Sequence, residues 1–408
     1  MATKIIEHDL CGEPRDLTGL EAYSHLLVLV RWRGRVLGQL RLEAGDGTIS
    51  AGSLRRAAHL KFGGAITSRL AGDLVYGAAP PAGGRPENPS SSIVVCTRDR
   101  PEDLQRCLAA ACSFAGPGTE VLVVDNAPSD DRTALLTKEF PVRYALETRP
   151  GLNRARTRGA EEGSGEIVIY IDDDAIPGNG WLDALLEPFA NPEVAAVTAL
   201  VMPSELETDA QEVFERHCGF SRGFARREFT AETISPLAAA NVGAGACMAI
   251  RRRLVTGHGL FRAEMDCGTA TRSGGDTYAF YRLLSLGYRI VYTPDAVAWH
   301  RHRRTDAELR ETLAGYSVGT YAFLLRALLG HGEIAALHIG FRWFASHHLR
   351  QLYRWFRGKT DAQPVSLTLA EIGGILSAPG AYLRSRREER RKAGNLPASD
   401  PGSRRAIS

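Results

Sequence analysis

Three consecutive aspartates, Asp172, Asp173 and Asp174, directly follow the apolar run "IVIYI" at residues 167–171. A run of β-branched and aromatic residues of this length is typical of a strand buried on both faces, as in a parallel sheet. Two interpretations of the aspartates follow from the residues alone. They form a solvated turn that caps a helix beginning near Trp181, or they bind a hard divalent cation, which prefers carboxylate oxygens and leaves coordination positions open for phosphate.

Polar side chains also follow two earlier predicted strands, at residues 93–96 and 120–124. These side chains are Thr97, Arg98 and Asp99 after the first strand, and Asp125 and Asn126 after the second. Ligands of open α/β sheets gather at the carboxyl ends of the strands. We therefore expect these residues and the three aspartates to lie at one edge of a sheet.

The first of these strands is followed by neither a Gly-x-Gly-x-x-Gly loop nor a Gly-Lys-Ser/Thr loop. This argues against an NAD-dependent enzyme and against a P-loop ATPase. A ligand with its own diphosphate could instead be bound by a cation on the aspartates and by arginine side chains. Arginines precede the aspartate-bearing strand at positions 149, 154, 156 and 158, where they could also be solvated residues of a helix face.

The elements that must position these residues alternate between strand and helix. Apolar runs predict strands at 93–96, 120–124, 142–146 and 167–171, and helices are predicted from Arg100, Asp131 and Asn153. Such alternation predicts an α/β domain with a doubly wound, mostly parallel sheet.

Composition changes along the chain divide it into segments. Residues 1–75 are predicted to form a small β-containing module, because residues 26–42 read as two strands around an Arg33-Gly34 turn. Residues 76–91 are rich in Pro, Gly, Ala and Ser and read as a linker. The predicted segments after the α/β domain are a helical region at 306–383 and a basic, disordered tail at 384–408, which either solubilises the chain or contacts anionic lipid.

The composition is that of a globular protein with room for more than one domain: 408 residues, 44% hydrophobic and 24% charged. A net charge of +3 gives no support for nucleic acid as the main partner. Seven cysteines without paired spacing indicate reduced core residues and a cytoplasmic location. The N-terminus lacks a signal-peptide pattern, and no segment reads as a clean membrane span, since Arg326, His331 and Glu333 interrupt the nearest candidate.

From about Ser92 to His302 the chain resembles the family 2 glycosyltransferases, which are inverting, nucleotide-sugar-dependent enzymes with the GT-A fold. The resemblance rests on five motifs in the family's order: "SIVVCTRDRPEDLQRCL", "EVLVVDNAPSDD", "GEIVIYIDDDAIPGNGWLDAL", "NVGAGACMAIRRRLVTGHGLF" and "GGDTYAFYRLLSLGYRIVYTPDAVAWH". It implies a GT-A domain at 92–305, between the N-terminal module and the C-terminal helical region.

The resemblance also implies roles on the donor side. Asp172 and Asp174 would form a DxD motif that holds the donor ribose and a Mn²⁺ or Mg²⁺ ion on the diphosphate, and the cation would offset their mutual repulsion. The implied metal ligands are Asp174, Asp172 and His300. The implied nucleotide-sugar-binding residues are Thr97, Arg98, Asp99, Asp125, Asn126, Arg156, Asp172 and Asp173.

On the acceptor side, the family's general base is the Asp of a Glu-Asp pair that precedes a helix. The spacing to "YRLLSLGYRIVY" places this base at Asp276, although Asp276 could also only cap the helix. The family's Glu is replaced here by Gly275, which leaves the hydrogen bonding on the acceptor side open.

One further motif, "QLYRW" at residues 351–355, fits the Gln-x-x-Arg-Trp pattern of processive members of the family. It lies far beyond Asp276, within a segment rich in arginine and aromatic residues. We expect this segment to be an amphipathic helix that packs on the domain or lies on a membrane surface, with packing favoured.

The sequence thus predicts an inverting glycosyltransferase that moves a sugar from a nucleoside diphosphate sugar to a hydroxyl of a saccharide, a lipid-linked or a small-molecule acceptor. Such a reaction belongs to glycan, polysaccharide or glycoconjugate biosynthesis. The expected location is the cytoplasm or the inner face of the membrane. Two alternatives stay open: a sugar-phosphate nucleotidylyltransferase, which would need a Gly-rich loop after its first strand, and a non-catalytic nucleotide-sugar-binding protein of the same fold.

Overall fold

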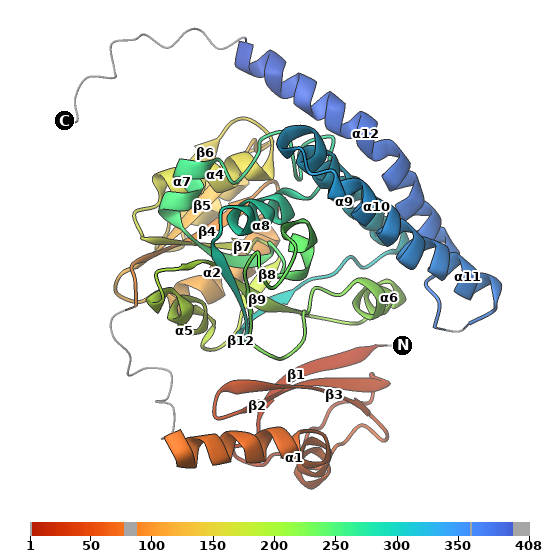
Figure 1. Ribbon diagram of the computed structural model, residues 1–408. Coiled ribbons are helices and arrows are strands. Elements are labelled where there is room, and N and C mark those ends of the chain that lie inside the picture. Colours follow the sequence, from red (N-terminus) through yellow and green to blue (C-terminus); the bar gives the residue numbers. More distant parts are fainter. Residues whose placement is uncertain (1, 77–87, 360, 395–408) are drawn as a thin grey trace.

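The computed structural model describes residues 2–76, 88–359 and 361–394. Its N-terminal part is a three-stranded sheet of β1 (Thr3–Asp9), β2 (His25–Trp32) and β3 (Arg35–Glu43), followed by α1 (Ala51–Tyr76) (Figure 1). The two predicted strands are confirmed as β2 and β3. Arg33 and Gly34 join them with positive φ angles of 52° and 75°, as a two-residue hairpin turn requires.

Strand β2 is buried on both faces. Leu26, Val28 and Val30 pack in a cluster with residues of α1, whereas the alternate residues Leu27 and Leu29 belong to the core of the main domain. Polar contacts reinforce this interface, since the Val36 N–H donates to Asp295 Oδ1 over 2.8 Å. The N-terminal module is therefore docked on the main domain. Of the predicted linker, residues 77–87 lie outside the described residues.

The main domain is built on a mixed sheet with the strand order β10-β12-β9-β11-β7-β4-β5-β6, and β8 pairs with β12. The strands are β4 (Ser91–Thr97), β5 (Thr119–Asn126), β6 (Arg143–Glu147), β7 (Ile167–Asp172), β8 (Ala175–Pro177), β9 (Val194–Pro203), β10 (Arg227–Phe229), β11 (Cys247–Arg251) and β12 (Arg289–His300). Strands β7, β4, β5 and β6 are parallel, as are β9 and β12, and β11 runs antiparallel between β7 and β9. The prediction of a mostly parallel sheet is confirmed.

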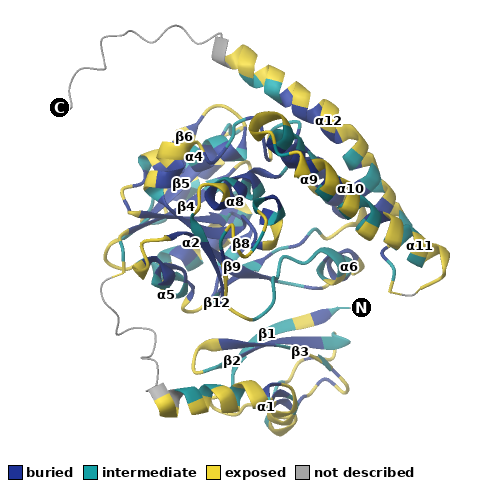
Figure 2. Cartoon of the chain, viewed as in Figure 1, coloured by how far each residue is buried: buried dark blue, intermediate teal, exposed yellow. Residues whose placement is uncertain are grey.

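Helices cover both faces of this sheet because the side chains of each strand alternate. On β4, Ile93 and Val95 pack with residues of α2, and Val94 packs with residues of α4. The helices of this domain are α2 (Pro101–Phe114), α3 (Arg132–Thr137), α4 (Leu152–Glu162), α5 (Trp181–Leu186), α6 (Asp209–Cys218), α7 (Arg252–His258) and α8 (Gly275–Ser285), with 3₁₀ turns η1 (Glu187–Ala190) and η2 (Pro236–Asn241). Figure 2 shows the central strands as the most buried part of the chain.

The C-terminal region is helical, as predicted. It consists of α9 (Asp306–His331), α10 (Ala335–Trp343), a π-helical turn η3 (Phe344–Leu349), α11 (Arg350–Phe356) and α12 (Val365–Gly394). A capping box between Thr305 and Glu308 starts α9. Helix α12 lies along α9 on the outside of the molecule (Figure 1).

The prediction of a disordered tail at 384–408 is wrong for its first residues. Residues 384–394 continue α12, while residues 395–408 lie outside the described residues. This part of the helix is held by distant contacts, because Ser385 Oγ donates to the Glu264 carbonyl over 2.7 Å and Glu389 forms an ion pair with Arg154. A local reading of the basic sequence could not reveal these partners.

Helix α9 is an exception to the expectation that no segment reads as a clean membrane span. Among the described residues it is the one helix that is long and apolar enough to cross a membrane, judged by length and composition alone. Half of its most apolar stretch is buried within the fold. A core helix of a globular protein passes the same test, so one such helix is weak evidence for a span. Each of the seven cysteines, all within the described residues, is free. Cys107 and Cys247 are buried as core residues, whereas the prediction of a core position is wrong for Cys11 and Cys267, which are exposed.

Candidate functional site

A cavity of about 830 Å³ opens at the carboxyl ends of β4, β5 and β7. Loops after these strands, the start of α8 and one side of α9 form its walls. The predicted site residues that line it are Thr97, Arg98, Asn126, Arg156, Asp172, Asp173, Asp174, Asp276 and His300. Residues separated by some two hundred positions in sequence thus meet in one cavity because parallel strands end at the same edge of the sheet.

Within the cavity, Asp172, Asp174 and His300 form a compact group whose potential ligand atoms all lie within 4.8 Å of one another. His300 Nε2 is 3.1 Å from Asp174 Oδ1. The backbone fixes this approach, because His300 at the end of β12 pairs with Ala175 of β8, the residue after Asp174. The buried His300 Nδ1 has no hydrogen-bond partner among the described residues. Two carboxylates and an imidazole fit a divalent cation such as Mn²⁺.

Positive side chains offset the repulsion among the three aspartates. Arg100 Nη1 lies 3.0 Å from Asp174 Oδ2 and 3.3 Å from Asp173 Oδ1, and Arg156 Nη2 lies 3.9 Å from Asp172 Oδ1. Burial raises the pKa of both Asp172 and Asp173. Burial also acts to raise the pKa of Asp174, but His300 and Arg100 outweigh it and lower that pKa, so Asp174 is the most firmly ionised carboxylate of the three.

Asp173 connects two strand ends of the site. Its Oδ2 accepts a hydrogen bond of 2.7 Å from Thr97 Oγ1, which ties the end of β4 to the end of β7. Arg100 holds its other oxygen. Both lone-pair-rich oxygens of Asp173 are therefore engaged by the protein itself, and its predicted contact with the nucleotide sugar stays a prediction.

Two predicted residues, Asp99 and Asp125, are not among the described residues that line the cavity. Asp99 Oδ1 accepts hydrogen bonds from the backbone N–H and hydroxyl of Ser129, at 2.8 and 2.9 Å. Asp125 is fully buried at the end of β5, where Oδ2 accepts from the Tyr144 hydroxyl over 3.0 Å. Its Oδ1 is buried without a partner among the described residues. Their contact with a nucleobase stays a prediction.

Asp276 lies in the first turn of α8 and faces the loop before β11. Its Oδ2 accepts from the Gly245 N–H at 2.8 Å, and its Oδ1 accepts from the Thr277 N–H at 2.7 Å. A side chain at Gly245 would collide with Asp276, since its Cβ would lie 2.7 Å from Oδ2. The N-cap of the helix is Gly274, so the alternative that Asp276 is the cap residue is wrong.

The structure explains why position 275 is glycine. A Cβ built on Gly275 would lie 2.2 Å from Asp266 Oδ2 and 2.5 Å from the side-chain amide of Asn153. Asp266 is buried, has a φ of +84° and pairs with Arg156 over 2.8 Å. The carboxylate that the family's Glu would supply is thus not simply lost, because Asp266 brings another carboxylate to the same place.

Sequence reasoning missed several charged residues that line the cavity, among them Arg100, Asp266, Arg301 and Arg303. The Arg301 N–H donates to the Asp174 carbonyl over 3.0 Å, and Arg303 Nη1 lies 3.9 Å from Asp174 Oδ2. The basic run "HRHRR" directly after β12 was a signal that could have identified the two arginines of that run. No local pattern marks Asp266.

A cavity with acidic residues at the carboxyl ends of the strands lies where open α/β sheets usually bind their ligands, and comparison with known proteins narrows the class. Residues 92–258 match the model of the glycosyl transferase family 2. The chain therefore carries a family 2 glycosyltransferase domain, and the mixed sheet agrees with the predicted GT-A type of fold.

Relatives of the chain carry glycosyltransferase names. It is 26% identical over 223 residues to the glycosyltransferase AglE of Haloferax volcanii. The aligned region covers 53% of this chain and 68% of that protein. It is 26% identical over 241 residues to the pre-mycofactocin glycosyltransferase of Mycobacterium tuberculosis. The aligned region covers 58% of this chain and 46% of that protein. The chain thus spans less than half the length of the second relative.

Among solved structures, the chain is similar to a mannosyltransferase, PcManGT from Pyrobaculum calidifontis, in complex with GDP-Man and Mn²⁺. The sequence identity is 18% and the TM-score is 0.47, over 81% of this chain and 89% of that chain.

We expect Gly275→Ala to destabilise the protein, because its Cβ would displace Asp266 from Arg156. Overpacking of a buried site costs about 1–3 kcal/mol of unfolding free energy. Gly275→Glu, which restores the family's residue, should be at least as destabilising. The matched control is Gly257→Ala in α7, where no described atom would lie within 4 Å of the new Cβ. Urea denaturation measures both, and equal midpoints for Gly275→Ala and the parent would contradict the collision.

Proposed function

We propose that this chain is an inverting, metal-dependent glycosyltransferase that transfers a sugar from a nucleoside diphosphate sugar to a hydroxyl acceptor. The observation that carries the proposal is the shared cavity: the cation-type group of Asp172, Asp174 and His300 lies in the same 830 Å³ space as Asp276. The family match at residues 92–258 supports glycosyl transfer over nucleotidyl transfer.

On the donor side, the cavity offers both charges that a nucleoside diphosphate needs. Asp172, Asp174 and His300 would hold Mn²⁺ or Mg²⁺, which when bound neutralises charge on the departing diphosphate. Guanidinium groups of the cavity would bind the phosphate oxygens directly, since their fork of N–H donors matches phosphate geometry. The arginines placed for this are Arg98, Arg100, Arg301 and Arg303.

On the acceptor side, inversion requires one direct displacement at the anomeric carbon and one base to take the proton of the attacking hydroxyl. Asp276 is suited to this task because two backbone N–H groups fix the orientation of its carboxylate. The acceptor would be a saccharide, a lipid-linked or a small-molecule hydroxyl, in glycan, polysaccharide or glycoconjugate biosynthesis. Glu311 and Tyr316 of α9 also line the cavity.

We assign the chemistry to the segment 92–305, with residues 1–75 and 306–383 as flanking parts. The division is not complete, because helix α9 of the C-terminal region reaches the cavity. Because it forms a wall of the cavity, the C-terminal region would contribute to the acceptor site.

Donor binding should depend on a cation held by Asp174. We expect Mn²⁺ to increase the affinity for a nucleoside diphosphate, and Asp174→Asn to weaken Mn²⁺-dependent binding by roughly 10-fold or more, a loss of about 1.4 kcal/mol or more. Calorimetric titration with and without Mn²⁺ measures this. Asp46→Asn, an exposed aspartate of the N-terminal module, is the control. Equal affinities with and without Mn²⁺ in the parent protein would remove the metal from the proposal.

Asp276→Asn should separate catalysis from donor binding. The variant keeps the size of the side chain but not its ability to take a proton, so the transfer rate should fall by roughly 10²-fold or more. Donor affinity should stay within a few-fold of the parent. Asp46→Asn, the same change at an exposed aspartate outside the cavity, is the control and should leave the rate nearly unchanged. A rate that Asp276→Asn leaves within a few-fold would exclude Asp276 as the base.

We also propose a cytoplasmic protein that contacts the inner face of an anionic membrane through α10 and α11. The expected packing is present on one face of this segment, where Trp343 stacks on Tyr321 of α9 and His348 is buried. The other face is exposed at Ile334, Phe341 and Phe356, and Figure 2 draws much of α10 and α11 as exposed. The basic side chains nearby are Arg342, Arg357 and Lys359. Exposed aromatic residues among basic ones suit an interface with anionic lipid.

Vesicle sedimentation tests this contact. The protein should bind vesicles that contain phosphatidylserine and should not bind pure phosphatidylcholine vesicles. The double variant Phe341→Ser/Phe356→Ser should lose the binding, whereas Leu60→Ser/Leu74→Ser on α1, which removes equally exposed apolar side chains, should retain it. Equal binding by both double variants would exclude α10 and α11 as the membrane contact.

A further inference from the structure

A second group of potential metal ligands lies in the C-terminal helical region, between η3 and α12. It consists of His347, His348 and Glu371, whose ligand atoms all lie within 4.8 Å of one another. The Nε2 atoms of both histidines are 3.9 Å from Glu371 Oε2. None of these three residues lines the cavity of the candidate active site.

The π-helical turn η3 brings the two adjacent histidines to the same carboxylate. Neighbouring residues of an α-helix point about 100° apart, and wider π turns are rare and often occur at functional sites. The rings of His347 and His348 lie 4.8 Å apart. Trp343 stacks on His347, and Phe344 stacks on His348 with their centroids 5.7 Å apart, so aromatic neighbours hold both imidazoles in place.

The burial of His348 is not compensated by hydrogen bonds. Its side chain is fully buried, and neither ring nitrogen has a hydrogen-bond partner among the described residues. A buried polar group without a partner costs about 1–3 kcal/mol and calls for an explanation such as a bound ion.

The third ligand is oriented by a relay of hydrogen bonds. Gln363 Nε2 donates to Glu371 Oε2 over 2.9 Å, and Gln351 Oε1 accepts from the backbone N–H of Gln363 over 3.2 Å. Hydrogen bonds of this kind commonly fix carboxylates that bind metals. The motif at residues 351–355 therefore has a structural explanation, because its Gln351 supports this relay and its Arg354 pairs with Asp361.

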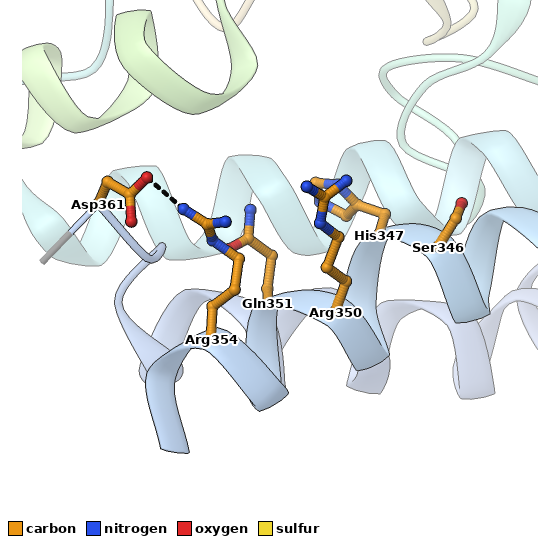
Figure 3. Close-up of a pocket in the computed structure, with 6 residues that line it drawn as sticks. All are labelled: Ser346, His347, Arg350, Gln351, Arg354 and Asp361. Atoms are coloured by element: carbon orange, nitrogen blue, oxygen red, sulfur yellow. Dashed lines mark hydrogen bonds and ion pairs between the residues drawn. The ribbon is translucent and has the colours of Figure 1, made fainter. Parts of the chain in front are cut away.

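Solvent reaches the group through a small cavity of about 270 Å³. Figure 3 shows its lining, in which His347 lies beside Ser346, Arg350, Gln351, Arg354 and Asp361, with Arg354 paired to Asp361. The His347 side chain is 27% exposed, whereas the side chains of Glu371 and His348 are buried. An ion can thus enter past His347, and Arg350 and Arg354 can attract an anion as a further ligand.

We propose that His347, His348 and Glu371 form a second metal site that binds a divalent transition-metal ion of the Zn²⁺ type. Two imidazoles and one carboxylate suit Zn²⁺, and three protein ligands leave one tetrahedral position for water or an anion. Tetrahedral ligands at about 2.0–2.1 Å from Zn²⁺ are roughly 3.4 Å apart. The two separations of 3.9 Å between a histidine Nε2 and Glu371 Oε2 each require a contraction of about half an ångström, and all ligand atoms of the group lie within 4.8 Å of one another. The ion would join η3 to α12 and stabilise the C-terminal region.

The experiment uses the full chain, stripped of metal with a chelator and then titrated with Zn²⁺ or with Co²⁺, whose visible spectrum reports tetrahedral coordination. We expect Zn²⁺ to raise the Tm, and His348→Ala and Glu371→Gln each to weaken Zn²⁺ binding by at least about tenfold. Glu371→Gln preserves the size of the buried side chain, so it remains informative if His348→Ala fails to fold.

Two controls separate this site from other binding. Asp174→Asn should retain the Zn²⁺-dependent rise in Tm and the tetrahedral Co²⁺ spectrum, because it changes only the candidate active site. His338→Ala, which removes an exposed histidine of α10, should behave as the parent does. No rise in Tm for the parent would overturn the proposal, as would an equal rise in the parent and in Glu371→Gln.

Discussion

The site depends on the balance of charge at the end of β7. Three adjacent carboxylates repel one another strongly when buried, and they can stay together only if positive groups surround them. Arg100, Arg156 and His300 supply this charge from the start of α2, from α4 and from the end of β12. The order of the strands and the packing of these two helices on opposite faces of the sheet are therefore conditions for the site, because each element delivers one of the compensating charges.

The sequence was sufficient to predict those parts of the fold and the site that depend on local residue patterns or on the periodicity of strands. Apolar runs followed by polar residues predicted β4, β5 and β7, and the geometry of parallel strands predicted that Thr97, Asn126 and Asp172 would meet. His300 could be placed only through the family resemblance, since β12 is more than a hundred residues away. Asp266 could not be predicted, because its proximity to Arg156 depends on the missing side chain of Gly275 and on a left-handed backbone conformation. The helical end of α12 could not be predicted either, because it is held by Glu264 and Arg154, which are distant in sequence.

The C-terminal helices are connected to the active-site region at several points. Helix α9 forms a wall of the cavity, and α12 contacts both Glu264 and Arg154. Glu264 precedes Asp266 by two residues, and Arg154 precedes Arg156 by two residues. The helix that carries Glu371 thus also touches the two segments that hold the buried Asp266–Arg156 pair. A change in the stability of α12 can reach the part of the cavity next to Asp266 and Asp276 through these contacts.

Strand β2 has a consequence for synthesis on the ribosome. One of its faces packs with α1, so all partners of this face are translated soon after β2. The other face belongs to the core of the main domain, which is translated much later. Val36 and its partner Asp295 are 259 residues apart, and at about 5–20 residues per second this separation takes roughly 13–52 s to translate. During that time Leu27 and Leu29 face water on the nascent chain. The N-terminal module is therefore a site where chaperones or aggregation compete with folding.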